Sequence, residues 1–287
     1  MLADIARAIG ELSATLKSVS GTKKDTALGF GEANAYHWDA TSLTLLRVDS
    51  VSAVPLSLLR GINDIRATLE QNTLQFARAH SANNALLWGA RGMGKSSLVK
   101  ALHASIAQRS DKDLKRLVLV EINREDIASL PALMRAIAPL PARFIVFCDD
   151  LSFDAGEVTY KSLKTILDGG LEGRPANVLF YATSNRRHLM PRDMIDNERS
   201  TSINPGEAVD EKISLSDRFG LWLGFHNCSQ DEYLEMVAGY SAHYGIQIGA
   251  DELRSRAIAW AAARGARSGR VAIQFIRQLA GEKGQAI

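Results

Sequence analysis

One eight-residue segment constrains the fold of this chain more than any other. Residues 89–96 read Gly-Ala-Arg-Gly-Met-Gly-Lys-Ser, which matches the pattern G-x-x-x-x-G-K-[ST] at every fixed position. An apolar run at 85–88 precedes the segment, and helical spacing follows it over 97–102. Glycines allow backbone N–H groups to turn inward around an anion, and the next helix presents its positive N-terminus to that anion. The sequence therefore predicts a strand, a phosphate-binding loop and a helix in that order.

The residue types of this loop indicate a nucleoside triphosphate as the ligand. The Lys95 side chain can reach the β- and γ-phosphates, and the Ser96 hydroxyl can ligate Mg²⁺. An accidental glycine-rich turn is the alternative, but the strand, helix, lysine and hydroxyl together argue against it. The residues expected to contact the nucleotide are Gly89, Ala90, Arg91, Gly92, Met93, Gly94, Lys95, Ser96 and Ser97.

Composition limits the class of protein only loosely. The 287 residues suffice for about two domains, and 34 Lys and Arg against 32 Asp and Glu argue neither for nor against nucleic acid. Cys148 and Cys228 have no metal-ligand spacing, which suits a reducing compartment. The N-terminal residues include charges that a signal peptide would lack, and no apolar run is long enough for a membrane span. A cytoplasmic protein is expected.

The hydrophobic periodicity changes twice along the chain. Residues 2–19 carry an apolar stripe at steps of three and four, which predicts an amphipathic helix that packs on the chain itself or on a partner. Residues 20–42 are rich in Gly, Ser, Thr and Asn and are expected to be irregular, anchored by Phe30, Tyr36 and Trp38. Residues 1–54 are therefore expected to precede the first domain.

From residue 55 to 228, apolar strands alternate with helices. Strands are expected at 117–122, 144–148, 178–182 and 220–225, and helices at 62–76 and 130–137. This alternation predicts an α/β domain with an open parallel sheet and helices on both faces. After Cys228 the pattern is wholly helical, at 230–244, 250–264 and 271–280, so residues 229–287 are expected to form a small all-α domain.

Polar side chains stand where two of these strands end. Asp149 and Asp150, called here the acidic pair, close the strand that begins at Phe144, and Asn185 follows the next one. A carboxylate at this position can hold Mg²⁺, and a second one can polarise the attacking water, which Asn185 can orient without adding charge. A solvated turn and a strand-end cap are the alternative explanations.

Taken together, residues 55–287 resemble the AAA+ ATPases. In that superfamily a phosphate loop, an acidic pair and a polar sensor occur in this order, as Gly89–Ser96, the acidic pair and Asn185 do here. The resemblance implies a P-loop fold with a C-terminal helical lid, bound ATP and Mg²⁺, and a homo-oligomer. Within Ser214–Gly220, Arg218 resembles the arginine finger that reaches a neighbouring subunit's γ-phosphate. In Arg267–Ala272, Arg270 resembles the second sensor over the nucleotide.

More closely, four segments resemble a family of bacterial AAA+-like ATP-binding proteins of unknown function. They are 86–98, 144–153, 171–189 and 206–223. The chain departs from most AAA+ members by carrying Asp-Asp where they carry Asp-Glu. The shorter Asp150 side chain places its carboxylate farther from the water, so slow turnover is expected.

Two function classes remain open at this point. The protein can be an oligomeric ATPase that remodels or loads a macromolecular partner, with nucleic acid as one such partner. Alternatively, it is a slow ATP-dependent switch whose nucleotide orders the lid and exposes an interface. A small-molecule phosphotransferase is a distant third, because no acceptor-binding segment is evident.

Overall fold

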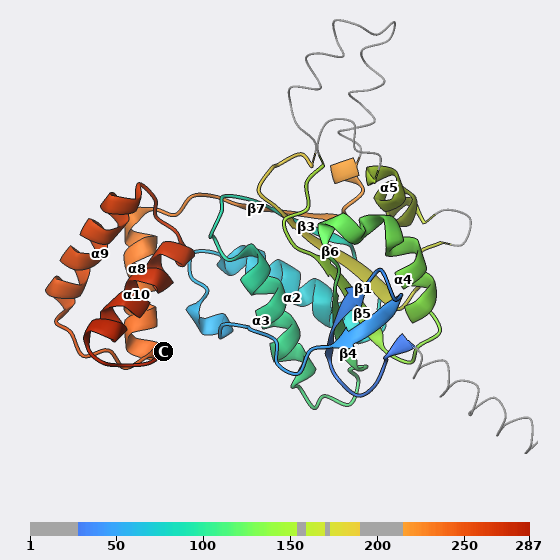
Figure 1. Cartoon of the computed structure of the whole chain (residues 1–287), viewed down its shortest axis with the longest axis horizontal. Helices are drawn as coiled ribbons and strands as arrows, with labels where there is room; N and C mark the ends of the chain where they lie inside the picture. The colour runs from blue at the N-terminus through green and yellow to red at the C-terminus, as the bar shows by residue number, and fades with distance from the viewer. Residues whose placement is uncertain (1–27, 154–158, 170–172, 190–214) are drawn as a thin grey trace, which may run out of the picture.

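The computed structural model describes residues 28–153, 159–169, 173–189 and 215–287 (Figure 1). Within these ranges seven strands form one sheet, in the order β2-β1-β4-β5-β6-β3-β7. Strand β3, which leads into the glycine-rich loop, thus lies inside the sheet between β6 and β7. The strands are β1 (Ala35–Asp39), β2 (Thr44–Arg47), β3 (Ala85–Gly89), β4 (Leu117–Glu121), β5 (Arg143–Cys148), β6 (Val178–Ser184) and β7 (Leu221–Phe225).

Neighbouring strands pair in parallel, except for the antiparallel hairpin of β1 and β2. Parallel strands need crossover connections, and the connecting helices cover both faces of the sheet. α2 (Asn63–Ala77) and α3 (Lys95–Ala107) lie on one face, and α4 (Leu130–Ile137) and α5 (Tyr160–Asp168) on the other (Figure 1). Short 3₁₀ helices precede α2 and α4, namely η1 (Leu56–Leu58) and η2 (Arg124–Ser129).

The central strands are buried on both faces. In β5, Ile145 and Phe147 belong to the core beneath α2 and α3, whereas Phe144 and Val146 belong to the core beneath α4 and α5. Each of these four side chains is at most 1% exposed. Burial on both sides explains why the strands read as continuous apolar runs. The prediction of a parallel α/β sheet covered on both faces is confirmed.

Three helices follow the sheet and pack on one another where β7 ends (Figure 1). They are α8 (Gln230–His243), α9 (Ala250–Arg264) and α10 (Gly269–Glu282). α8 begins with a capping box, in which Ser229 and Glu232 each accept a hydrogen bond from the other's backbone N–H. The predicted small helical lid is confirmed, and the division into domains at 55–228 and 229–287 remains a prediction.

The prediction of irregular structure over 20–42 is wrong for residues 35–39, which form β1. Tyr36 and Trp38 are 2% and 0% exposed, and they alternate with the more exposed His37. This period of two is a strand signal that the flanking Gly, Ser and Asn residues obscured. Because β1 pairs with β4, the sheet extends N-terminal to the expected boundary at residue 55.

The predicted helix at 2–19 and the loop at 190–212 lie outside the described residues. Among the helices that the structure does describe, none combines the length and apolarity needed to cross a membrane.

Candidate functional site

The loop between β3 and α3 adopts backbone conformations that favour glycine. Gly92 and Gly94 have φ angles of 74° and 90°, where any side chain would be strained. Gly89 has a φ of 126°, and a Cβ atom there would lie 2.0 Å from the carbonyl oxygen of Phe225. The next residue, Ala90, donates its N–H to the same oxygen at 2.9 Å. The path of the chain therefore favours glycine at all three positions, of which Gly89 and Gly94 are fixed in the motif and Gly92 is not.

Lys95 is held inside the loop. Its Nζ donates to the carbonyl oxygens of Gly89 and Ala90, both at 2.8 Å, and to Oδ1 of Asn185 at 3.1 Å. The residue is only 7% exposed. This burial lowers the pKa of the Lys95 ammonium, while the carboxylates of the acidic pair act in the opposite direction. A buried cation bound only to neutral oxygens is suited to receive an anionic ligand.

The next residue, Ser96, meets the first member of the acidic pair. Ser96 Oγ donates a hydrogen bond of 2.5 Å to Asp149 Oδ1, and Thr183 Oγ1 donates to the same oxygen. Thr183 Oγ1 also accepts the backbone N–H of Asp150 at 2.9 Å. Thr183 is a site residue that was not predicted from the sequence, although it lies in the polar end of β6, just before Asn185.

Asn185 joins the loop to the second carboxylate. While its Oδ1 accepts from Lys95, its Nδ2 donates to Asp150 Oδ1, so both ends of the amide are engaged. Asp150 itself has a φ of 51°, a left-handed conformation that is uncommon for a residue with a side chain. The structure thus places Lys95, Asn185 and Asp150 in one hydrogen-bonded chain.

The lid contacts the same loop through the start of α10. The N–H of Arg270 donates to the carbonyl oxygen of Gly92 at 3.2 Å. A Cβ atom on Gly92 would lie 2.9 Å from Ser268 Oγ and 3.0 Å from Arg270 Cβ. Ser268 also caps α10 by accepting the N–H of Val271. Gly92 is therefore needed for its backbone conformation and for the close approach of the lid. Arg270 lies beside the loop, and its predicted position over a bound nucleotide stays a prediction.

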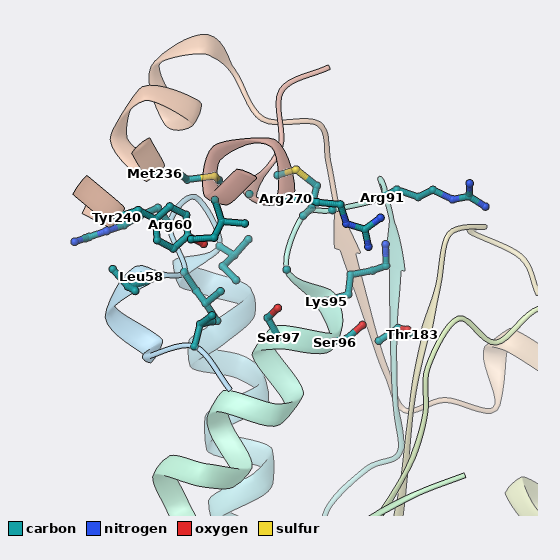
Figure 2. A pocket seen from close by; sticks show the side chains of 18 of the residues that line it. Leu58, Arg60, Arg91, Lys95, Ser96, Ser97, Thr183, Met236, Tyr240 and Arg270 are labelled. Carbon is teal, nitrogen blue, oxygen red and sulfur yellow. The ribbon is translucent and has the colours of Figure 1, made fainter. Parts of the chain in front are cut away.

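These residues line one end of a cavity of about 640 Å³ between the loop and the lid. Figure 2 shows Lys95, Ser96 and Thr183 at this end, with Arg270 above them and Tyr240 and Leu58 farther along the cavity. Predicted loop residues that line it are Arg91, Gly92, Met93, Gly94, Lys95, Ser96 and Ser97, together with Asp149, Asp150, Asn185 and Arg270. Gly89 and Ala90 instead contribute the carbonyl oxygens that hold Lys95.

The other end of the cavity was not predicted from the sequence. Its lining is mainly apolar, includes two arginines, and comes from residues 54–62 in and around η1 and from α8 and α10. The residues are Val54, Leu58, Leu59, Arg60, Ile62, Met236, Tyr240, Ile273 and Arg277. A cavity that is polar and cationic at one end and apolar at the other suits a nucleotide, with its phosphates at the loop and its base beneath the lid.

Arg218 is the one predicted site residue that the structure keeps away from this constellation. Among the described residues that line the cavity, Arg218 does not occur. Its Nε instead forms an ion pair with Oδ1 of Asp168, the last residue of α5. Arg218 is therefore not part of the cavity of its own subunit in this arrangement.

The sheet order, the loop after an internal strand and the helical lid identify the fold as that of an AAA+ P-loop ATPase. A similar fold occurs in the Aeropyrum pernix ORC1 protein solved in complex with DNA, with a TM-score of 0.55 and 13% sequence identity. The similarity covers 78% of this chain and 61% of the ORC1 chain. The chain belongs to the family described as protein of unknown function DUF815, whose model matches residues 31–283.

Two further solved structures have more distant similarity. The RuvB Holliday junction branch migration motor of Thermotoga maritima is 14% identical over 78% of this chain and 71% of its own, with a TM-score of 0.45. A Walker-type ATPase of Pyrococcus abyssi is 15% identical over 80% and 71%, with a TM-score of 0.49. No curated protein matches the sequence of this chain.

Proposed function

We propose that this protein binds ATP with Mg²⁺ and hydrolyses it slowly, as an oligomeric ATPase of the AAA+ type. The observation that carries the proposal is the hydrogen-bonded arrangement around the loop. It links Lys95 through Asn185 to Asp150, and Ser96 to Asp149. These residues come from three strand ends and are distant in sequence, so a solvated turn or a simple strand cap does not account for their convergence.

The donor set fits the expected metal. The Ser96 hydroxyl and the Asp149 carboxylate are hard oxygen ligands, and Mg²⁺ in nucleotide sites takes few protein ligands and keeps several waters. The described residues contain no group of three or more His, Cys, Asp and Glu side chains that could form an all-protein metal cage. Bound Mg²⁺ would supply positive charge beside the β- and γ-phosphates.

Each side chain then has a specific task. Lys95 and the loop N–H groups would hold the phosphates, and Arg270 would approach the γ-phosphate from the lid. Asp150 and Asn185 would orient the attacking water. The Asp150 carboxylate would do so by accepting a hydrogen bond from that water. The apolar end of the cavity would hold the base. Because Asp150 is one methylene shorter than glutamate, turnover is expected to be slow.

Arg218 would complete the site of a neighbouring subunit. A cation supplied in trans stabilises the charge that develops on the γ-phosphoryl oxygens, and rates then depend on assembly. The position of Arg218 outside its own cavity supports this role. In this proposal the oligomer couples hydrolysis to remodelling or loading of a macromolecular partner. Nucleic acid is a partner worth testing first, since ORC1 of similar fold was solved with DNA.

A slow conformational switch is the second candidate function. The close approach of Ser268 and Arg270 to Gly92 favours it. Through these residues, a change in the loop on nucleotide binding would be transmitted to the lid. In that case ATP binding alone would expose or hide an interface, and hydrolysis would only reset it.

The ATP hydrolysis rate per subunit, measured over about a hundredfold range of protein concentration, separates the two candidates. Light-scattering mass with ATP present is recorded on the same samples. A rate that rises as the mass steps to a multimer supports the oligomeric ATPase, and Arg218→Ala should then bind ATP but lose turnover. A slow and constant rate on a monomer would contradict the trans role and favour the switch.

A further inference from the structure

The ion pair between Asp168 and Arg218 joins two segments that lie 50 residues apart in sequence. Asp168 ends α5, and Arg218 lies three residues before β7; in Figure 1 the start of β7 lies beside α5. The Asp168 and Arg218 side chains are 43% and 23% exposed. The bond is made through Nε, so the carboxylate favours one orientation of the guanidinium group.

Asp168 has no evident role in stabilising its own helix. A carboxylate on the last residue of a helix faces the negative end of the helix dipole, which disfavours it. The left-handed Gly169, with a φ of 85°, already ends α5 by donating its N–H to the carbonyls of Thr165 and Ile166. The ion pair with Arg218 instead engages this carboxylate.

The helix that carries Asp168 is connected to the nucleotide site. After the acidic pair, Leu151 donates its N–H to the carbonyl oxygen of Thr183 at 2.7 Å. Phe153 then packs edge-on against Tyr160, the first residue of α5, with ring centroids 6.4 Å apart. Thus α5 begins in contact with the segment that follows the acidic pair and ends at the residue that holds Arg218.

We propose that Asp168 is a positioning residue, which in each subunit holds Arg218 in the orientation that the neighbouring subunit's nucleotide site requires. The inference rests on the proposed trans role of Arg218 and adds the residue that prepares it. Arginine has many rotamers, so a fixed partner raises the fraction of molecules with the guanidinium correctly placed. An exposed ion pair shifts such an equilibrium by up to about fivefold, which orients the side chain without locking it.

Mixed oligomers of full-length variants test the inference. Lys95→Ala subunits lack a working nucleotide site but supply Arg218, and Arg218→Ala subunits supply the site but no finger. Each variant alone should be inactive, and the mixture should hydrolyse ATP. Adding Asp168→Ala to the Lys95→Ala subunit should lower the mixture's rate by up to about fivefold. The same change in the Arg218→Ala subunit should cause no such loss, because no guanidinium remains there to position.

Two controls separate positioning from a structural defect. Asp113→Ala removes a comparable exposed carboxylate that pairs with Arg78 through Nε, and in the Lys95→Ala subunit it should leave the mixture's rate unchanged. Asp168→Glu keeps the charge and should restore most of the rate. The melting temperature of each variant checks that the fold is retained.

The outcomes also separate this inference from the proposed function. An active mixture that Asp168→Ala does not slow, or slows equally from either subunit, would overturn the positioning role alone. A mixture that stays inactive while the wild-type protein turns over would overturn the trans role of Arg218 and the inference with it.

Discussion

Ser96 Oγ and Asp149 Oδ1 lie 2.5 Å apart although 53 residues separate them in the chain. The parallel sheet thus brings the second residue of α3 into hydrogen-bonding contact with the residue that follows β5. Thr183 on β6 donates to the same carboxylate oxygen, so two hydroxyl groups hold Asp149 Oδ1 in place. This arrangement makes the position of Asp149 depend on side chains that do not themselves carry charge.

Replacing Thr183 by Val should therefore reduce activity without unfolding the protein. Valine keeps the shape but removes the hydroxyl that donates to Asp149 and accepts from the Asp150 N–H. Loss of a ligand-orienting hydrogen bond typically costs about 10-fold to 100-fold in metal affinity or activity. The measurement is the ATPase rate as a function of Mg²⁺ concentration. Thr165→Val, which removes an exposed helix hydroxyl, is the matched control and should have no effect.

Lys95→Ala should lower ATP affinity by about 100-fold or more, because the phosphates lose a charge-assisted donor. Isothermal titration of ATP into each variant is the direct measurement. Lys100→Ala removes a lysine from the same helix that pairs with Glu121, and this control should bind ATP like the wild-type protein. Unaltered affinity in Lys95→Ala would refute the assignment of the phosphate loop.

Gly92→Ala should weaken ATP binding more than backbone strain alone explains. The added Cβ would meet Ser268 Oγ at 2.9 Å and so push the lid from the loop. Gly245→Ala is the matched control, because Gly245 also has a positive φ, of 64°, but its Cβ would meet nothing within 4 Å. Both variants should lose about 1 kcal/mol of stability from strain.

Only Gly92→Ala should also raise the dissociation constant for ATP. The increase is about tenfold if the lost lid contact contributes about 1.4 kcal/mol to the binding free energy. Equal ATP affinities for Gly92→Ala and Gly245→Ala would show that the lid contact does not contribute to binding.

Stability should decrease between pH 7 and pH 5 because of His103. This α3 residue is 2% exposed, and burial lowers its pKa to about 4. The unfolded chain binds a proton near pH 6.5 whereas the folded protein stays neutral, so acidification favours unfolding. The part of the folding free energy that depends on neutral His103 is fully present above the unfolded pKa and is lost as the pH falls toward 4. The expected loss is about 2 kcal/mol between pH 7 and pH 5.

Urea unfolding of the wild-type protein and of His103→Gln at the two pH values measures this contribution. Glutamine can still donate to the carbonyl oxygen of Leu117, which His103 Nε2 contacts at 3.3 Å, but it cannot be protonated. The variant should show a smaller decrease. The exposed His80→Gln is the control, and it should follow the wild-type protein.

Most of the sheet could be predicted because its signals are local and contiguous. The expected helix at 130–137 matches α4, and the strand expected at 144–148 differs from β5 by one residue. The polar strand ends at the acidic pair and Asn185 could also be placed together, because the carboxyl ends of parallel strands share one edge. Their convergence with Lys95 and Ser96 follows from that geometry.

What the sequence did not reveal depends on contacts between distant segments. Tyr240 and Leu58 line the same cavity only because the lid docks beside η1, and neither belongs to a local pattern. The proposed role of Asp168 likewise depends on its ion pair with Arg218, and a short-range sequence pattern cannot detect a contact between residues 50 positions apart. Strand β1 was missed for a different reason, because its two buried aromatic residues are embedded in a segment of loop-like composition.

The backbone bond from Ala90 N to Phe225 O has a mechanical consequence. The phosphate loop starts where β7 ends, and the four residues 226–229 after β7 lead directly into α8. Any rotation of the lid about this connection would have its pivot next to the glycine-rich loop. Small rotations would then move Tyr240 and Met236 much farther than they move Gly89. A rotation of this kind would widen the apolar end of the cavity and leave the end at Lys95 almost unchanged.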